Sequence, residues 1–211
     1  MKRYQKLKRV MDILFSIMGI MLLLPLFLIL AIAIKVESKG PVFFKQKRYG
    51  KGKIPFDLYK FRTMYLDAPK DAPTYSIRHP DQYITKVGKI LRRTSLDELP
   101  QIWNILVGQM SFVGPRPVVL NEYDLIVERD KYGANDIRPG LTGWAQINGR
   151  DELTPDVKAR IDGEYVKEMS LKNDLVCLLK TIPVILKQDG FVEGATASLA
   201  HQEVAVTEEA N

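Results

Sequence analysis

The chain has 211 residues, of which 46% are hydrophobic and 27% are charged, and its 31 basic and 25 acidic residues give a formal charge of +6. This length and composition are typical of one folded domain or slightly more, and they exclude a chain that is disordered throughout. A single cysteine, Cys177, excludes an internal disulfide framework and a metal cluster held by several cysteines.

The positive charge is concentrated in the N-terminal third of the chain. Residues 1–62 hold 14 basic and 3 acidic residues, a net charge of +11, whereas residues 63–211 hold 17 basic and 22 acidic residues, a net charge of −5. We therefore expect the N-terminal third to meet any polyanionic partner, which leaves nucleic acid, phosphorylated small molecules and an anionic bilayer.

Inside this basic region, residues 13–34 form a run of 22 residues without a charge. A membrane helix needs about 17 to 25 such residues, whereas the apolar part of a signal peptide has roughly 7 to 15. The run therefore favours a membrane helix over a cleaved leader and favours a bilayer over nucleic acid. We predict a basic arm over residues 1–11 and a membrane helix over residues 12–34.

Pro25 lies near the middle of the apolar run, where it removes a helical hydrogen bond and predicts a kink. Both flanks of the run are basic, and positive flanks stay on the cytoplasmic side. A helix that enters the membrane, bends and returns keeps both flanks on that side. A tilted span with a tolerated proline is the alternative that these residues leave open.

The pattern changes after residue 41. Residues 42–47 and 54–61 are rich in aromatic and branched side chains around a glycine turn, and they predict a β-hairpin. Residues 68–80 hold three prolines and predict a loop. Helical periodicity is present over residues 101–110, 119–130, 156–169 and 174–187.

The last of these helices is apolar on nearly its whole surface, as in a helix that lies in a membrane interface or in a buried core helix. Residues 191–211 are small, acidic and aperiodic, and they predict a mobile tail.

Adjacent carboxylates, Asp97 and Glu98, follow two arginines in the segment 91–101. Ser95 and Glu98 have the spacing of a capping box, in which both side chains only satisfy amides at a helix start. Local sequence favours this capping role over a catalytic one. Pro100 would fall inside such a helix, so we expect the regular helix to begin about one residue before that proline.

Two further segments are suited to binding anions. Arg116 lies between two prolines in the segment 111–117, and such a rigid turn suits bidentate binding of phosphate. The segment 138–150 combines three glycines, two arginines and two amides around a tryptophan. Glycines let the backbone approach an anion closely, and amides hydrogen-bond to sugars or base edges.

Taken together, these segments resemble one family, the bacterial sugar transferases of the small monotopic phosphoglycosyl transferase type. The resemblance rests on Lys8 and Arg9 with Asp12, and on residues 59–64, 95–101, 110–117, 138–140 and 149–150. It therefore covers nearly the whole chain.

The resemblance implies an α+β, mostly helical fold with a re-entrant membrane helix broken at Leu24 and Pro25, a small β-hairpin and interfacial amphipathic helices. Relatives often have serine where this chain has Leu24, so a hydroxyl that could satisfy the broken backbone is missing. The resemblance also implies a catalytic domain over residues 35–190 on the cytoplasmic face of the bacterial inner membrane.

The implied reaction moves a sugar phosphate from a UDP-sugar to undecaprenyl phosphate and releases UMP, as the first membrane step of glycan assembly. Asp97 would be the nucleophile that forms a covalent phospho-sugar, and Glu98 would hold Mg²⁺. The residues expected to bind phosphate or other parts of the substrates are Arg93, Arg116, Arg138, Gln146, Asn148, Arg150, Lys60 and Arg62.

The expected partners are the UDP-sugar donor, the undecaprenyl phosphate acceptor and anionic phospholipids, with no nucleic acid. A non-catalytic membrane scaffold for glycan assembly is the alternative function. The motifs do not distinguish among galactose-type, N-acetylated and diamino-trideoxy sugars, and they do not indicate an oligomeric state.

Overall fold

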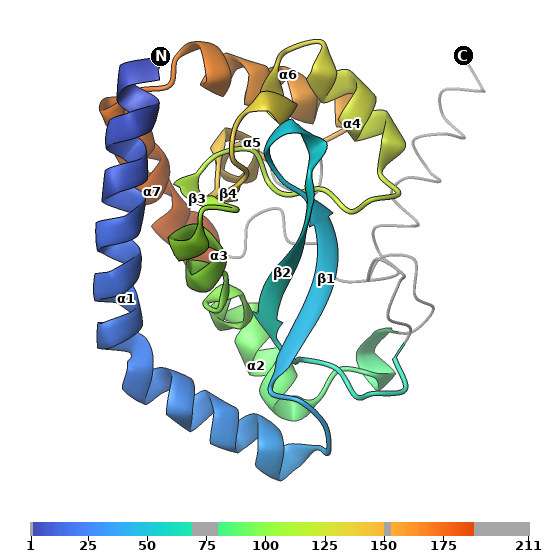
Figure 1. Cartoon of the computed structure of the whole chain (residues 1–211). Coiled ribbons are helices and arrows are strands. Elements are labelled where there is room, and N and C mark those ends of the chain that lie inside the picture. The colour runs from blue at the N-terminus through green and yellow to red at the C-terminus, as the bar shows by residue number, and fades with distance from the viewer. Residues whose placement is uncertain (1, 69–79, 150–152, 188–211) are drawn as a thin grey trace, which may run out of the picture.

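The computed structural model describes residues 2–68, 80–149 and 153–187 (Figure 1). The predicted tail over residues 191–211, Arg150 and most of the predicted loop over residues 68–80 lie outside the described residues. Among these residues the fold is α+β and mostly helical, as predicted.

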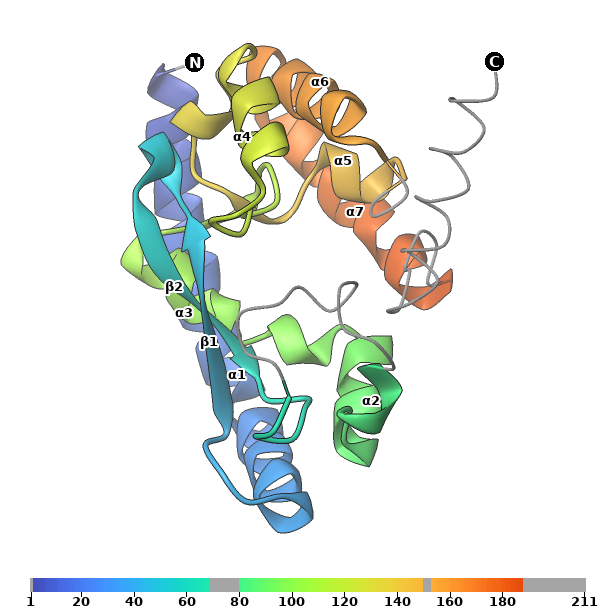
Figure 2. The ribbon, with the colours of Figure 1, turned by 90° about the vertical axis from the view of Figure 1, so that its right-hand side faces the viewer.

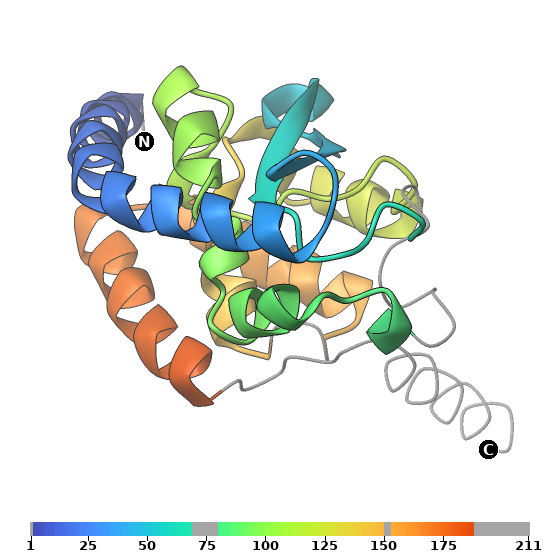
Figure 3. The same ribbon diagram turned by 90° about the horizontal axis from the view of Figure 1, so that it is seen from below.

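The first element is the long helix α1 (Lys2–Glu37), which contains Pro25. The predicted basic arm and membrane segment therefore form one continuous helix. Figures 1 and 3 show that α1 bends in its middle, as expected where a proline removes a backbone donor. Large apolar side chains are exposed in both halves, including Leu22 at 72% and Ile32 at 63%. Within the described part of the chain, α1 alone is long and apolar enough to cross a membrane.

The predicted hairpin is confirmed. Strand β1 (Phe43–Tyr49) pairs antiparallel with β2 (Pro55–Phe61), with Phe43 opposite Phe61. Phe56, Leu58 and Phe61 of β2 are buried, and the first two pack with Ile105. Figure 2 shows the hairpin running along one side of the domain toward α4 (Tyr123–Asp130), with α2 (Lys86–Arg93) lying apart from it.

Helices were correctly predicted in four further regions, with shifts at their ends. They are α3 (Gln101–Val107), α4, α6 (Pro155–Lys167) and α7 (Leu171–Lys187). The Tyr165 ring and Cys177 are buried in a core that α6 and α7 share. The outer side of α7 exposes Leu179, Ile182 and Leu186, so this helix is buried on one side only.

Two features were not anticipated from the sequence. One is α2, which packs closely on Thr63 because Gly88 has no side chain: a Cβ there would lie 2.1 Å from the Thr63 carbonyl oxygen. The other is a parallel pair of short strands, β3 (Ser111–Val113) and β4 (Gly140–Thr142), followed by the short helix α5 (Trp144–Ile147). A Cβ on Gly140 would lie 2.1 Å from the Gly114 nitrogen, so this pairing requires glycine.

Polar contacts attach the first half of α1 to the domain. Asp174 on α7 accepts hydrogen bonds from the hydroxyl groups of Tyr4 and Tyr165, each at 2.7 Å, and it forms a buried ion pair with Lys8. Asp12 accepts hydrogen bonds from the Ser111 hydroxyl and the Phe112 N–H. These contacts fix α1 against α7 and β3 with charged groups that are shielded from solvent.

Candidate active site

The two adjacent carboxylates lie on a short 3₁₀ turn (Leu96–Glu98) between α2 and α3. Ser95 precedes this turn with φ 55° and ψ 16°, a left-handed conformation that abruptly changes the direction of the chain. The Ser95 side chain makes no capping hydrogen bond, and the Glu98 carboxylate binds side chains from other elements. The predicted capping box is therefore wrong. Pro100 is the N-cap of α3, which begins at Gln101 and so starts later than expected.

Cations from two distant segments converge on Glu98. The Lys60 Nζ atom, on β2, lies 2.8 Å from Glu98 Oε1, and the Arg116 Nη2 atom, in the turn after β3, lies 2.9 Å from the same oxygen. Lys60 Nζ also lies 3.7 Å from Asp97 Oδ2. The structure thus brings together Asp97, Glu98, Lys60 and Arg116, four of the residues that the sequence analysis named as candidates.

The electrostatics of the two carboxylates differ. Burial would raise the pKa of Glu98, but the charges and hydrogen bonds of Arg116 and Lys60 hold that pKa well below its usual range. Burial raises the pKa of Asp97, and the neighbouring Glu98 charge adds to the rise, while Lys60 and Arg92 oppose it. Glu98 is therefore held as a carboxylate, whereas the charged form of Asp97 is less favoured.

Asp97 is 8% exposed, yet it accepts no hydrogen bond from any residue in the described ranges. Most buried carboxylates accept hydrogen bonds from nearby donors. A buried carboxylate that accepts none retains lone pairs that can react or bind a ligand. The Lys60 ammonium, at 3.7 Å, neutralises charge without occupying those lone pairs. Asp97 therefore has the environment of a nucleophile beside a positively charged anion site.

The structure brings Arg92 to this site in preference to Arg93. Arg93 is exposed, whereas the Arg92 Nε atom donates to the Thr63 hydroxyl at 2.9 Å and its charge acts on Asp97. The sequence analysis named Arg93 and not Arg92 as a phosphate-binding residue, and that role of Arg93 stays a prediction. Gly88 packs against the same Thr63, and residues four apart share one face of a helix. Helical spacing from Gly88 would therefore have pointed to Arg92.

Three of the residues predicted to bind substrate donate hydrogen bonds to backbone carbonyl oxygens away from the two carboxylates. Arg138 donates through Nε to the Gly108 oxygen at 2.8 Å, beyond the end of α3. Arg62 is buried, and its guanidinium donates to carbonyl oxygens in the last turn of α1 and just after it. Asn148 donates to the Trp144 oxygen. The hydrogen bonds of these three residues satisfy the orphan carbonyls of helix ends and adjoining turns.

Gln146 on α5 is buried beside Arg116, and both line one cavity. Arg150 lies outside the described residues. Leu24 and Pro25 are exposed on α1.

The carboxylates are compatible with a magnesium ion that a diphosphate shares. The described residues contain no group of three or more His, Cys, Asp or Glu side chains that could hold a metal alone. Mg²⁺, however, is usually bound by one or two carboxylates together with substrate phosphates and waters. Lys60 and Arg116 both bind Glu98 Oε1, and none of the described residues donates to Oε2. Glu98 Oε2 is therefore the oxygen that could bind such an ion.

The sequence profile described as bacterial sugar transferase matches residues 3–188. A UDP-N-acetylgalactosamine-undecaprenyl-phosphate N-acetylgalactosaminephosphotransferase of Aeromonas hydrophila is 39% identical over 189 residues, which cover 87% of this chain and 44% of that protein. A UDP-glucose:undecaprenyl-phosphate glucose-1-phosphate transferase of Caulobacter vibrioides is 42% identical over 191 residues, which cover 86% of this chain and 70% of that protein.

The exopolysaccharide production protein ExoY of Sinorhizobium fredii is 36% identical over 197 residues, which cover 87% of both chains. The match thus spans less than half of the Aeromonas relative but most of the ExoY protein.

Proposed function

This chain belongs to the bacterial sugar transferase family, and we propose that it transfers a sugar phosphate from a UDP-sugar to undecaprenyl phosphate and releases UMP. The observation that carries the proposal is Asp97, a buried carboxylate that lies 3.7 Å from the Lys60 Nζ atom and accepts no hydrogen bond from the residues that the structure describes. The names of two relatives, which both describe UDP-sugar and undecaprenyl phosphate as substrates, support it. Those names differ in the sugar, so the proposal leaves the sugar open.

In the first step, an oxygen of Asp97 attacks the phosphorus that carries the sugar. A covalent aspartyl phospho-sugar forms, and the bond between the two phosphates breaks, so that UMP leaves with the bridging oxygen and its electron pair. In the second step, an oxygen of undecaprenyl phosphate attacks the same phosphorus and the Asp97 carboxylate is restored. Splitting one transfer into two displacements lets a single site serve a soluble donor and a lipid acceptor in turn.

Lys60 and Arg116 supply positive charge where the phosphates would lie. Both bind Glu98 in the structure, and a planar guanidinium such as Arg116 also suits bidentate contact with phosphate. Glu98 Oε2 would hold a magnesium ion, which supplies Lewis-acid stabilisation of charge on the diphosphate. The depressed pKa of Glu98 supports this assignment, because a metal ligand must stay deprotonated.

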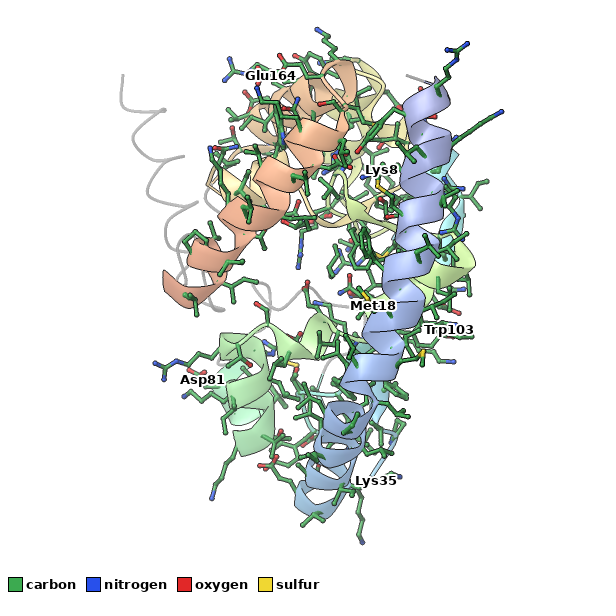
Figure 4. All side chains as sticks on the ribbon, turned by 90° about the vertical axis from the view of Figure 1, so that its left-hand side faces the viewer. Lys8, Met18, Lys35, Asp81, Trp103 and Glu164 are labelled. Carbon is green, nitrogen blue, oxygen red and sulfur yellow. The ribbon has the colours of Figure 1, made fainter. Side chains whose placement is uncertain are left out.

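We also propose that α1 is re-entrant and that α7 lies in the membrane interface, which places the site on the cytoplasmic face. The bend in α1, its exposed apolar side chains and the basic residues at both ends support this topology (Figure 4). Lys8 lies before the bend and Lys35 after it. The phosphate of a polyprenyl lipid stays at headgroup depth, so a catalyst anchored in one leaflet can reach it.

The decisive experiment is a panel of nucleotide sugars scored by UMP release with the full-length chain, undecaprenyl phosphate and Mg²⁺. We expect UMP from at least one UDP-sugar, complete loss in Asp97→Asn, and full activity in Asp81→Asn, an exposed carboxylate that serves as the matched control.

With a radiolabelled sugar and no acceptor, the wild type should retain label on the protein after denaturation. Normal UMP release by Asp97→Asn would refute the covalent step. If the wild type binds membranes but releases no UMP from any donor of the panel, the non-catalytic scaffold is favoured.

A further inference from the structure

A cavity adjoins the candidate active site on the side away from the two apolar helices. The cavity is lined by residues from the end of β1, the turn after β3, α4, α5 and α6. Arg116, in the turn after β3, is one of the lining residues. The Arg116 guanidinium also binds Glu98, so the cavity begins one side chain away from the carboxylates. Figures 1 and 3 show α4 on the opposite side of the molecule from the first half of α1 and from α7. A ligand there would be water-soluble rather than a lipid.

Positive charge predominates in the wall of this cavity. Arg48, Arg116, Arg129 and Lys158 line it, with Glu122 as its one acidic wall residue in the described part of the chain. Arg129 is matched by Asp162, to which its Nε atom donates at 2.9 Å. Arg116 pairs with Glu98, and Arg48 donates to the Pro117 oxygen and to Gln46 Oε1. The four cations of the wall outnumber its acidic residue Glu122, whose Oε2 atom accepts a hydrogen bond from the Val119 N–H. The cavity is therefore suited to a ligand rich in oxygen acceptors.

Gln146 contributes an acceptor that the protein itself does not use. The side chain is 8% exposed, and its Nε2 atom donates to the Leu141 oxygen at 3.2 Å. Its Oε1 atom is buried and has no hydrogen-bond partner among the described residues. Because an unsatisfied buried acceptor is costly and uncommon, such an atom points to a ligand that donates a hydrogen bond.

We propose that this cavity binds the nucleoside half of the donor and that Gln146 recognises uracil. Uracil presents one N–H donor between two carbonyl acceptors. The N3–H would pair with Gln146 Oε1, and the carbonyl groups would face the cations Arg48 and Lys158. Apolar walls from Val118 and Leu125 would cover the base, and Arg116 would bind the adjoining phosphates. This inference rests on the proposed function and assigns its nucleotide to a place in the fold.

Cytosine provides the sharpest comparison, because its N3 atom is an acceptor and would oppose Gln146 Oε1. Binding of UMP, CMP and inorganic phosphate is therefore measured by calorimetry on the full-length chain in detergent. We expect the wild type to prefer UMP over CMP. In Gln146→Leu, UMP should bind about tenfold more weakly, or ~1.4 kcal/mol, while phosphate affinity is unchanged and the preference over CMP shrinks. An unchanged UMP affinity, or an equal loss for phosphate, would overturn the assignment.

A second measurement does not depend on the affinity of a variant. 4-Thio-UMP bound to the wild type is photocrosslinked, and the attached peptide is identified by mass spectrometry. We expect adducts between residues 117 and 125 or on α5, and adducts confined to α1 or α7 would contradict the proposal. Lys158→Met should weaken UMP binding, whereas Lys167→Met, an exposed lysine on the same helix, should not.

The two proposals fail differently. If the wild type releases UMP in the donor panel but Gln146→Leu binds UMP and CMP as the wild type does, the nucleoside assignment is wrong and the transferase proposal stands. If no donor yields UMP but UMP still protects the cavity from crosslinking, the transferase proposal fails and the binding site stands.

Discussion

The Glu37 carboxylate, at the last residue of α1, accepts a hydrogen bond from the Lys86 backbone N–H, 2.6 Å away, at the first residue of α2. Its second oxygen accepts from the Val87 N–H at 2.9 Å. A negative charge at a helix N-terminus is stabilising because it meets unpaired N–H groups and the positive end of the helix dipole. The end of the apolar helix is thus joined directly to the helix that precedes Asp97.

Replacing Glu37 should therefore weaken both stability and transfer. We expect Glu37→Ala to lower the free energy of unfolding by about 1 kcal/mol, the usual cost of losing an N-terminal cap. The measurement is chemical denaturation in detergent micelles, with UMP release followed in parallel. Glu164→Ala, which removes an exposed carboxylate from α6, should leave both quantities unchanged.

The rate of transfer should fall at acidic pH because of Asp97. Attack requires the ionised carboxylate, and burial raises the pKa of Asp97, so the rate is lost as the pH falls through this raised value. Glu98 does not set this limit, since Arg116 and Lys60 keep its pKa well below the usual range. The measurement is the pH profile of single-turnover UMP release.

Arg92 and Arg93 form a matched pair for this profile. Arg92 lowers the pKa of Asp97 by its charge, so Arg92→Met should move the acidic limb of the profile to higher pH. Arg93 is exposed, and Arg93→Met should leave the limb in place. An identical shift in both variants would show that Arg92 has no special effect on Asp97.

The buried pair of Arg129 and Asp162 should be essential for stability. Each is at most 4% exposed, and removing one partner leaves an uncompensated buried charge. We expect Arg129→Met to cost about 3 to 5 kcal/mol, and the double variant with Asp162→Asn to recover part of that loss. Denaturant titration of the three variants tests this, and simple additivity of the two single losses would contradict it.

Labelling with a membrane-impermeant thiol reagent tests the topology of α1. Lys6→Cys and Lys39→Cys introduce exposed thiols on either side of Pro25, whereas the native Cys177 is buried. A re-entrant helix predicts that both thiols react in inside-out vesicles and that neither reacts in intact spheroplasts. A spanning helix predicts one reactive thiol in each preparation. Pro25→Leu should shift the pattern toward the spanning one, because it restores the missing backbone donor.

Much of the fold was predictable because it rests on local patterns. The hairpin follows from segments rich in aromatic and branched residues on either side of a turn that contains Gly50 and Gly52. The uncharged apolar run predicted a long helix, and Pro25 predicted its bend. The β3–β4 pair was not predictable, since each strand has only three residues and no periodicity. It depends on the backbone contact between Gly114 and Gly140, which are far apart in the sequence.

The candidate site was predictable in part, and for different reasons at each residue. Arg116 was identified by the prolines that flank it, whereas the assignment of Asp97 and Glu98 came from family resemblance. Local spacing favoured a capping box, because sequence does not show that Ser95 adopts a left-handed conformation. The sequence analysis named Arg62 and Arg138 as phosphate ligands, and it could not show that both donate to backbone carbonyl oxygens in the folded chain.

The Arg62 guanidinium holds the Ser38 and Lys39 carbonyl oxygens, at 2.8 and 2.6 Å, and Arg62 directly follows β2. The end of α1 and the strand that carries Lys60 must therefore move together. Once α1 lies in a lipid leaflet as proposed, its depth is set by how well its apolar length matches the hydrocarbon thickness. A change in acyl chain length would then raise or lower Asp97 relative to the lipid phosphate. The rate of the proposed transfer should therefore change with bilayer thickness.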